Sequence, residues 1–197
     1  MAYVIRIARQ SDAAALREIY APYVTKTAVS FEYDVPSVEE FSRRMEKISG
    51  KYPFLVAEED GKILGYANTK PFVGRAAYEH SAETTIYLCE SAKGRGIGRA
   101  LYAALEKISL MQNIFNLNAC IGHADPEDEY LTNASERFHE KMGYSLVGTF
   151  HRSGYKFGRW YDMVWMEKIV GEAAGTVPQV IPFPSLDSEK LAKIITI

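Results

Sequence analysis

The stretch Glu83–Leu88 (ETTIYL), with the glycine-rich turn Lys93–Gly98 (KGRGIG) that follows it, carries the strongest signal in the sequence. Its first part is rich in β-branched and aromatic residues and predicts a strand. Residues 101–111, after the turn, have apolar side chains at helical spacing. Glycine lets the backbone approach a ligand closely, and a helix N-terminus favours a bound anion. The stretch therefore predicts a strand, a phosphate-binding turn and a helix, with a glutamate at the far end of the strand.

Two common phosphate-binding designs do not match this turn. A P-loop requires Gly-Lys-Ser/Thr, which the sequence lacks. A dinucleotide-binding fingerprint would need a glycine where Arg99 stands and an acidic residue about 20 positions further on, where residues 116–118 have none. A third design, a glycine turn between a splayed strand and a helix, binds the pyrophosphate of coenzyme A. The spacing of Gly94, Gly96 and Gly98 is compatible with that design.

Length and composition predict one well-packed domain. The chain has 197 residues, of which 47% are hydrophobic and 24% charged, and a net charge of −2, so no nucleic-acid partner is expected. No signal peptide and no transmembrane run is evident, which predicts a cytoplasmic protein with no membrane partner. The histidines are scattered without metal-ligand spacing, so no metal is expected. Cys89 and Cys120 stand alone and are expected to be reduced.

The pattern along the chain predicts an α/β (α+β) fold. Asp60-Gly61 between two apolar runs indicates a hairpin, and Ser37 with Glu40 forms a capping box before a helix. We expect strands at residues 3–7, 54–58, 63–67, 83–88, 117–121, 144–149 and 161–166, and helices beginning near residues 12, 38, 97 and 133. A mixed, mostly antiparallel central sheet with helices on both faces satisfies this order best. We expect a single domain over residues 1–170 and a tail, residues 171–197, lying on the surface or reaching a partner subunit.

Four motifs resemble one enzyme family. Lys93-x-x-Gly96-x-Gly98 is similar to the acetyl-CoA motif of the GCN5-related N-acetyltransferases (GNAT), which usually begins with arginine or glutamine. The stretches 83–87, 135–144 and 154–162 resemble the phosphinothricin acetyltransferase branch of that superfamily. The motifs follow the family's order, and the resemblance covers roughly residues 3–168. The resemblance implies a GNAT fold, acetyl-CoA as cosubstrate, a small amino-acid-like acceptor such as phosphinothricin or methionine sulfoximine, and a homodimer.

The chemistry of acetyl transfer to an amine gives two side chains candidate roles. The acceptor arrives as an ammonium ion, and a base that removes its proton contributes typically about 10²- to 10⁴-fold to the rate. The resemblance assigns this role to Glu83; the structural alternative is a solvated carboxylate at a strand end. His139 stands where many relatives have a tyrosine and the phosphinothricin branch has histidine. It could deliver a proton, help to deprotonate the acceptor, or hold a water molecule.

The resemblance also implies the residues that contact the two substrates. Contacts to acetyl-CoA are expected from Ile86, Tyr87, Leu88, Lys93, Gly94, Arg95, Gly96, Ile97, Gly98 and Asn133, with Thr132 as a competing match for the last. A strand N–H near Leu88 is expected to polarise the thioester carbonyl. Contacts to the acceptor are expected from Phe31, Glu32, Arg75, Tyr78, Lys156 and Trp160.

Within the acceptor set, Arg75 could bind a carboxylate in a bidentate pair. Val73 stands where the phosphinothricin branch has a second basic residue, which argues against tight phosphinothricin recognition. Two other functions stay open at this point: N-acetylation of a polyamine, an aminoglycoside or a protein N-terminus, and non-catalytic binding of coenzyme A. A nucleotide-binding oxidoreductase is a third alternative.

Overall fold

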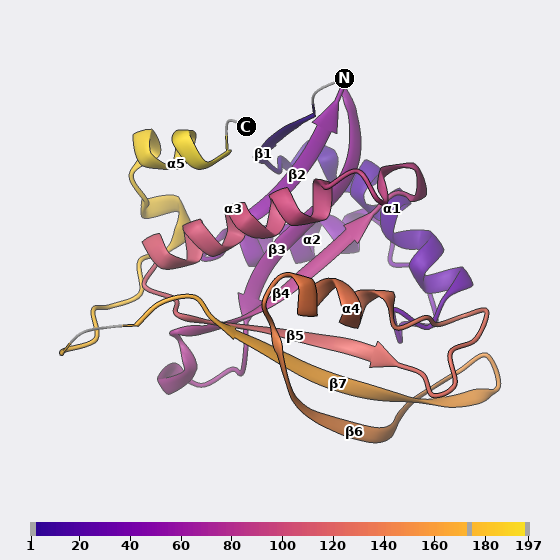
Figure 1. Ribbon diagram of the computed structural model, residues 1–197. Coiled ribbons are helices and arrows are strands. Elements are labelled where there is room, and N and C mark those ends of the chain that lie inside the picture. The colour runs from indigo at the N-terminus through magenta and orange to yellow at the C-terminus, as the bar shows by residue number, and fades with distance from the viewer. Residues whose placement is uncertain (1–2, 173–174, 196–197) are drawn as a thin grey trace.

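One seven-stranded sheet organises the chain, in the order β1-β2-β3-β4-β5-β7-β6 (Figure 1). The computed structural model describes residues 3–172 and 175–195. The strands are β1 Val4–Ile7, β2 Phe54–Glu59, β3 Lys62–Pro71, β4 Ser81–Leu88, β5 Asn116–His123, β6 Ser145–Lys156 and β7 Arg159–Ile169. The helices are α1 Ala13–Lys26, α2 Val38–Ser49, α3 Ile97–Met111, α4 Ala134–Lys141 and α5 Ser188–Ile195. The predicted order of elements and the mixed, mostly antiparallel sheet are confirmed.

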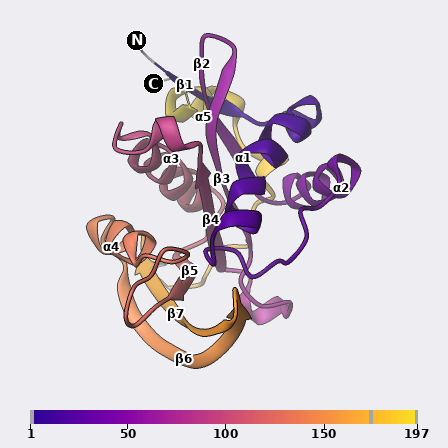
Figure 2. The same ribbon diagram turned by 90° about the vertical axis from the view of Figure 1, so that its right-hand side faces the viewer.

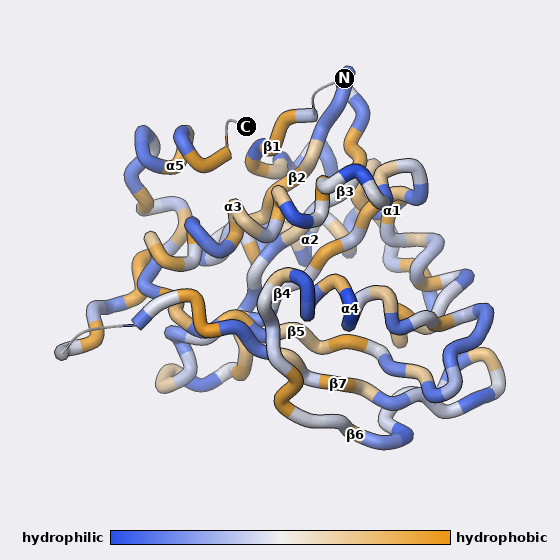
Figure 3. The backbone as a smooth tube through the Cα atoms, viewed as in Figure 1, coloured by the Kyte–Doolittle hydropathy of each residue, from blue (hydrophilic) through white to orange (hydrophobic). Residues whose placement is uncertain are grey.

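Helices cover both faces of the sheet, as expected. Figure 2 shows α1 and α2 on one side and α3 and α4 on the other. The buried face of α3 contributes Leu101, Leu105 and Ile108 to the larger hydrophobic core, while Leu16 of α1 and Met45 of α2 belong to a second core on the opposite face. In Figure 3, hydrophobic residues gather along the central strands, and α4 is coloured largely hydrophilic. Burial of these two apolar layers is the main force that holds the fold together.

Two local motifs, the capping box before α2 and the Asp60-Gly61 turn, adopt the structures that the sequence predicts. The hydroxyl of Ser37 accepts a hydrogen bond from the Glu40 backbone N–H at 3.1 Å, so it caps α2. Asp60 and Gly61 both have positive φ, at 50° and 77°, as a tight two-residue hairpin between β2 and β3 requires.

The sheet opens between β4 and β5. These two strands run parallel and pair only at residues 81–83 with residues 116–118. Beyond Glu83 they diverge, which Figure 1 shows as a widening gap between the two arrows. The remaining neighbouring strands pair antiparallel over longer stretches. The gap therefore leaves one backbone edge of β4 without a strand partner from Thr84 onward.

The C-terminal segment packs back onto the domain and includes a helix, α5, that the sequence analysis does not predict. Phe183 and Leu191 are buried in the larger core. The side-chain amide of Gln112 donates to the carbonyls of Lys51 and Ile181, tying this segment to the end of α3. Cys89 and Cys120 are free thiols, as predicted. Among the described residues, no helix has the length and apolarity needed to cross a bilayer.

Candidate active site

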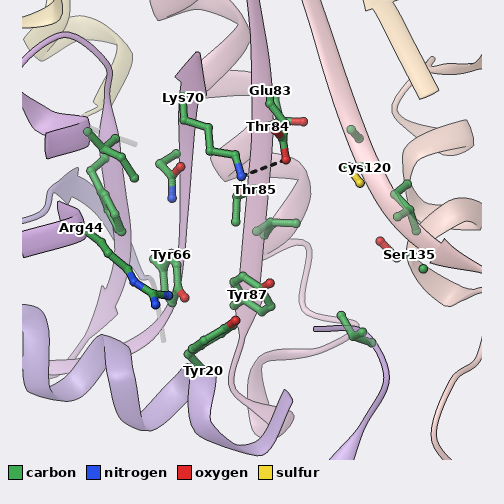
Figure 4. Close-up of a pocket in the computed structure, with 18 of the residues that line it drawn as sticks. Tyr20, Arg44, Tyr66, Lys70, Glu83, Thr84, Thr85, Tyr87, Cys120 and Ser135 are labelled. Carbon is green, nitrogen blue, oxygen red and sulfur yellow. Dashed lines mark ion pairs between the residues drawn. The ribbon is translucent and has the colours of Figure 1, made fainter. Parts of the chain in front are cut away.

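A cavity of about 280 Å³ lies where the sheet opens. Its walls come from β3, β4 and β5, from α1 and α2 on one face of the sheet, and from α3 and α4 on the other. Figure 4 shows β4 crossing it, with Glu83 at one end and Tyr87 nearer the α1 side. The cavity therefore connects the two faces of the sheet through the gap between β4 and β5.

Glu83 lines this cavity, as its predicted role requires. Its side chain is 17% exposed and forms an ion pair with Lys70 of β3, whose Nζ lies 2.9 Å from Oε1. The two residues are register partners on adjacent antiparallel strands, so the sheet itself holds the pair together. The structural alternative, a solvated carboxylate at the surface, does not describe this position.

His139 also lines the cavity, at 3% exposure, and makes two hydrogen bonds. Its Nδ1 lies 2.7 Å from the carbonyl oxygen of Ser135, and its Nε2 lies 3.0 Å from the hydroxyl of Tyr102. Because a carbonyl can only accept, Nδ1 is the donor, and Nε2 accepts from Tyr102. Burial lowers the pKa of His139 to about 4, opposed in part by the hydrogen bond to Ser135. The imidazole is therefore neutral near pH 7, which favours holding Tyr102 over donating a proton.

The glycine-rich turn leaves its backbone open to a ligand at the start of α3. Gly94 and Gly96 have φ values of 74° and 79°, and a Cβ placed on either would meet nothing within 4 Å. Gly96 is the N-cap of α3 and makes no side-chain cap, so the first N–H groups of the helix are available to an anion. Lys93 pairs with Glu90 at 2.7 Å and Arg95 with Glu59 at 2.7 Å, both at the surface.

Gly98 and Ile97 serve packing at the same helix end. Ile97 is fully buried. A Cβ on Gly98 would lie 3.3 Å from the side chains of Ile86 and Phe138, so glycine here lets α3 approach both β4 and α4. This close approach positions the turn beside the open edge of β4.

The predicted cofactor strand faces the gap. Ile86 and Tyr87 line the cavity. Leu88 points its backbone away from β3: its carbonyl accepts from the Tyr23 hydroxyl at 2.6 Å, and its N–H meets the same oxygen at 3.4 Å. Because backbone groups alternate along an antiparallel strand, those of Ile86 point the same way, beyond the last pairing with β5. The Ile86 amide is therefore open to a ligand, whereas Tyr23 already contacts the Leu88 amide.

Asn133 holds the loop before α4. Its Oδ1 accepts from the Ala124 N–H at 3.0 Å, and its Nδ2 donates to the Ala124 carbonyl at 3.0 Å. Both ends of the amide are thus occupied by backbone, while Thr132 is exposed. The predicted contact of either residue with a cofactor stays a prediction.

The predicted acceptor residues do not all gather at the cavity. Glu32 lines it and pairs with Arg44 of α2 at 2.6 Å, while its second carboxylate oxygen is buried and has no hydrogen-bond partner among the described residues. Arg75 and Tyr78 are exposed on the loop after β3 and lie outside the cavity lining. Trp160 is 54% exposed and contacts the ring of Tyr155, with 5.1 Å between the ring centroids.

Lys156 and Phe31 join the β6–β7 hairpin to the end of α1. The buried Lys156 ammonium donates to the carbonyls of Val24, Thr27 and Ser30, at 2.7, 2.9 and 2.6 Å. Burial lowers the pKa of Lys156, but its three donors are satisfied by backbone. The ring of Phe31 lies against Gly154, where a Cβ would meet it at 2.5 Å. In this structure both residues fasten the loop that carries Glu32.

The polar cavity residues that sequence reasoning missed include Lys70, Arg44 and Tyr102. A signal for Lys70 exists in the sequence, because Tyr66, Asn68 and Lys70 place a polar atom at every second position from the middle of β3 onward. Tyr102 occupies a core position of α3 and gives no such signal.

This arrangement is the one expected of a GNAT-type acyltransferase, in which a glycine turn and a helix N-terminus stand beside an opened strand edge. Comparison with known proteins agrees. The model of the acetyltransferase (GNAT) domain matches residues 5–165, and the chain belongs to this family.

Individual relatives are similar over most of their length. The phosphinothricin N-acetyltransferase of Streptomyces coelicolor is 36% identical over 170 residues, which cover 83% of this chain and 94% of the relative. The L-methionine sulfoximine/L-methionine sulfone acetyltransferase of Salmonella typhimurium is 30% identical, over 86% of this chain and 96% of that protein. A GNAT phosphinothricin acetyltransferase of Sinorhizobium meliloti, solved in complex with AcCoA, superposes with a TM-score of 0.82 at 33% identity, covering 94% of this chain and 98% of that one.

Proposed function

We propose that the protein transfers the acetyl group of acetyl-CoA to the amino group of a small amino-acid-like acceptor of the phosphinothricin or methionine sulfoximine type. The observation that carries this proposal is Glu83, a carboxylate at the inner end of a cavity that passes through the opened sheet. The names of the relatives support the acceptor class.

The residues present fit acetyl-CoA. The open N-terminus of α3 and the glycines before it suit a pyrophosphate, because backbone N–H groups and the helix dipole favour an anion there. The unpaired edge at Ile86 suits the amide groups of a pantetheine chain, which can pair with β4 as a strand would. Together these contacts would place the thioester in the cavity beside Glu83.

Glu83 then accepts one proton from the acceptor ammonium, which frees the nitrogen lone pair. The nitrogen forms a bond to the thioester carbonyl carbon, and the carbon–sulfur bond breaks. The second nitrogen-bound proton leaves with the sulfur, giving a thiol. A backbone N–H at the open edge of β4 stabilises the oxyanion, a contact typically worth about 3 kcal/mol. The neutral His139 holds Tyr102 in the wall of the cavity and supplies no proton.

The same proposal covers the molecular setting. The acetyltransferase domain spans residues 1–170, with residues 171–197 as an addition to it, and the protein works in the cytoplasm on a small molecule and not on nucleic acid or a membrane. The active form is a homodimer, for which the support is an exposed apolar area on β6 and β7.

Purified protein should release free thiol from acetyl-CoA when phosphinothricin, methionine sulfoximine or methionine sulfone is added. A polyamine and an aminoglycoside serve as comparison acceptors. If thiol is released only with the polyamine or the aminoglycoside, the proposed acceptor class is wrong. If none of these amines causes thiol release, the proposed enzymatic function is contradicted.

The variant Glu83→Gln tests the base. Turnover should fall by about 10²- to 10⁴-fold, because the amide cannot accept the proton. Binding of acetyl-CoA, measured by calorimetry, should persist, because the turn and the edge of β4 are untouched. Unchanged turnover would show that Glu83 is not the base.

A further inference from the structure

Two permanent cations line the cavity among the described residues, Arg44 and Lys70, and they differ in how far they are engaged. Arg44 lies between two carboxylates, with Glu32 at 2.6 Å and Glu40 at 3.0 Å. Lys70 has one charged partner, Glu83. Since an ammonium carries three donors, Lys70 keeps donor capacity for a further anion.

The Lys70–Glu83 pair lies where the chemistry is expected. The sheet register sets the two residues opposite each other on adjacent strands, and Figure 4 shows the ion pair between their side chains as a dashed line. Lys70 is the more accessible partner, with 40% of its side chain exposed against 17% for Glu83. A lysine ammonium sits on a flexible four-carbon stem and can move without disturbing the strand.

We propose that Lys70 binds the carboxylate of the acceptor and thereby selects zwitterionic α-amino acids; this rests on the proposed acetyltransferase function. An α-amino acid carries an ammonium and a carboxylate a few ångströms apart, and the ion pair presents the complementary charges in the same arrangement. As the zwitterion enters, Lys70 moves from Glu83 to the substrate carboxylate. Glu83 is released to receive the substrate ammonium, so one ion pair is replaced by two.

The resemblance to the phosphinothricin branch points to a different residue, Arg75. In this structure Arg75 is exposed and outside the cavity lining, as is Val73, which occupies the position of the branch's second basic residue. Lys70 precedes both and is directed into the cavity beside the base. The two assignments predict different variants to lose recognition of the carboxylate.

The test compares methionine sulfoximine with its carboxamide, in which a neutral amide replaces the carboxylate. In Lys70→Met, kcat/KM for the acid should fall by about 10- to 100-fold, chiefly through KM, because a charge-assisted contact is lost. The ratio of acid to carboxamide is the decisive quantity. Loss of the Glu83 counter-ion would change both substrates alike and leave the ratio unmoved, whereas loss of carboxylate binding lowers it.

Two further variants complete the design. Lys70→Arg keeps the cation and should restore most of the acid preference. Lys47→Met, on an exposed position of α2 outside the cavity, should leave both substrates unchanged. An unaltered acid-to-carboxamide ratio in Lys70→Met, or its loss in Arg75→Met instead, would overturn the proposal. Absence of thiol release by the unmodified protein would contradict the proposed function itself, so the two failures are distinguishable.

Discussion

His139 illustrates how burial settles the state of a single side chain. The imidazole is closed in by Ser135 and Tyr102 and has a pKa of about 4, against 6.5 for an ordinary histidine. The sequence leaves three roles open for His139: a proton donor, a helper in deprotonating the acceptor, or a residue that holds a water molecule. The hydrogen bonds favour a different role, the positioning of the Tyr102 hydroxyl. Protonation would force Nε2 to donate as well, and Tyr102 could then no longer donate to it.

This lowered pKa predicts a pH dependence of stability. Between pH 6.5 and 4 the unfolded chain binds a proton at His139 that the folded protein does not, so the free energy of unfolding falls as the pH drops through this window. From pH 7 to pH 5 the loss should be about 2 kcal/mol from this residue. Urea unfolding of the parent and of His139→Gln at both pH values measures it, because the variant lacks the titrating group. Equal losses in the two proteins would contradict the assignment.

For single residues, the sequence predicts the chemical role of a side chain better than it predicts which other side chains contact it. Glu83 is identified through its motif and lies in the cavity. Lys156 is singled out for the acceptor, yet its ammonium is taken by carbonyls 126 to 132 residues away. Lys70 escapes notice because the length of the β3–β4 connection leaves the register open, and only the register places it opposite Glu83. Contacts between distant segments are the part that sequence patterns do not contain.

At the scale of elements, contacts from the β6–β7 hairpin hold the loop between α1 and α2 in place. The ring of Phe31 packs against the backbone of Gly154, and the Lys156 ammonium donates to carbonyl groups at the end of α1. Lys156 also lies where a cation interacts favourably with the C-terminus of a helix. The position of Glu32 therefore depends on a hairpin more than 100 residues further along the chain.

Two glycines of β6 give a matched test of this fastening. Gly154→Ala should destabilise the protein by about 1–3 kcal/mol, because the new methyl group would overlap the Phe31 ring. Gly148→Ala, on the same strand with open space around its Cβ, should change stability by less than about 0.5 kcal/mol. Urea unfolding of both variants provides the comparison, and a similar effect at the two positions would argue against the contact.

The elements themselves follow closely from the sequence. Strands β2 to β4 and helices α2 and α3 begin and end within a few residues of their patterns, because apolar periodicity and caps act locally. Two elements depart from these patterns. Strand β6 continues to Lys156, seven residues beyond the predicted end at residue 149. Helix α5 is not predicted: at eight residues it is too short to form alone, and its burial against the core stabilises it.

At the scale of the whole molecule, the sheet is covered unevenly. Val164 and Met166 of β7 face the larger core, so Met163 and Trp165, which alternate with them, face the other side. On that side Phe150 lies opposite Met163 and is 56% exposed, and Phe72 contacts Trp165 with 5.4 Å between their rings. Such an apolar area is typical of a surface that another protein covers, which supports the proposed homodimer.

Sedimentation equilibrium tests this assembly. The protein should sediment at twice the chain mass of 22.1 kDa. Phe150→Glu should sediment as a monomer with unchanged circular dichroism, because a charge would be buried without a partner in the interface. Val38→Glu, an exposed apolar position on α2, should leave the dimer intact. A monomeric parent protein, or a dimeric Phe150→Glu, would contradict the proposal.

Because of the gap between β4 and β5, a pantetheine chain bound there would form hydrogen bonds with the sheet as a neighbouring strand does. Three residue pairs join two blocks of strands, β1–β4 and β5–β7–β6, so a pantetheine chain lying along Ile86 would act as an added link between them. In the free protein the Ile86 amide should exchange with deuterium faster than that of Tyr87, which is paired to β3. Saturating acetyl-CoA should slow the Ile86 exchange most. Binding of acetyl-CoA would then strengthen the link between the two halves of the central sheet. If the protected amides are centred on another segment, the pantetheine chain does not bind along Ile86.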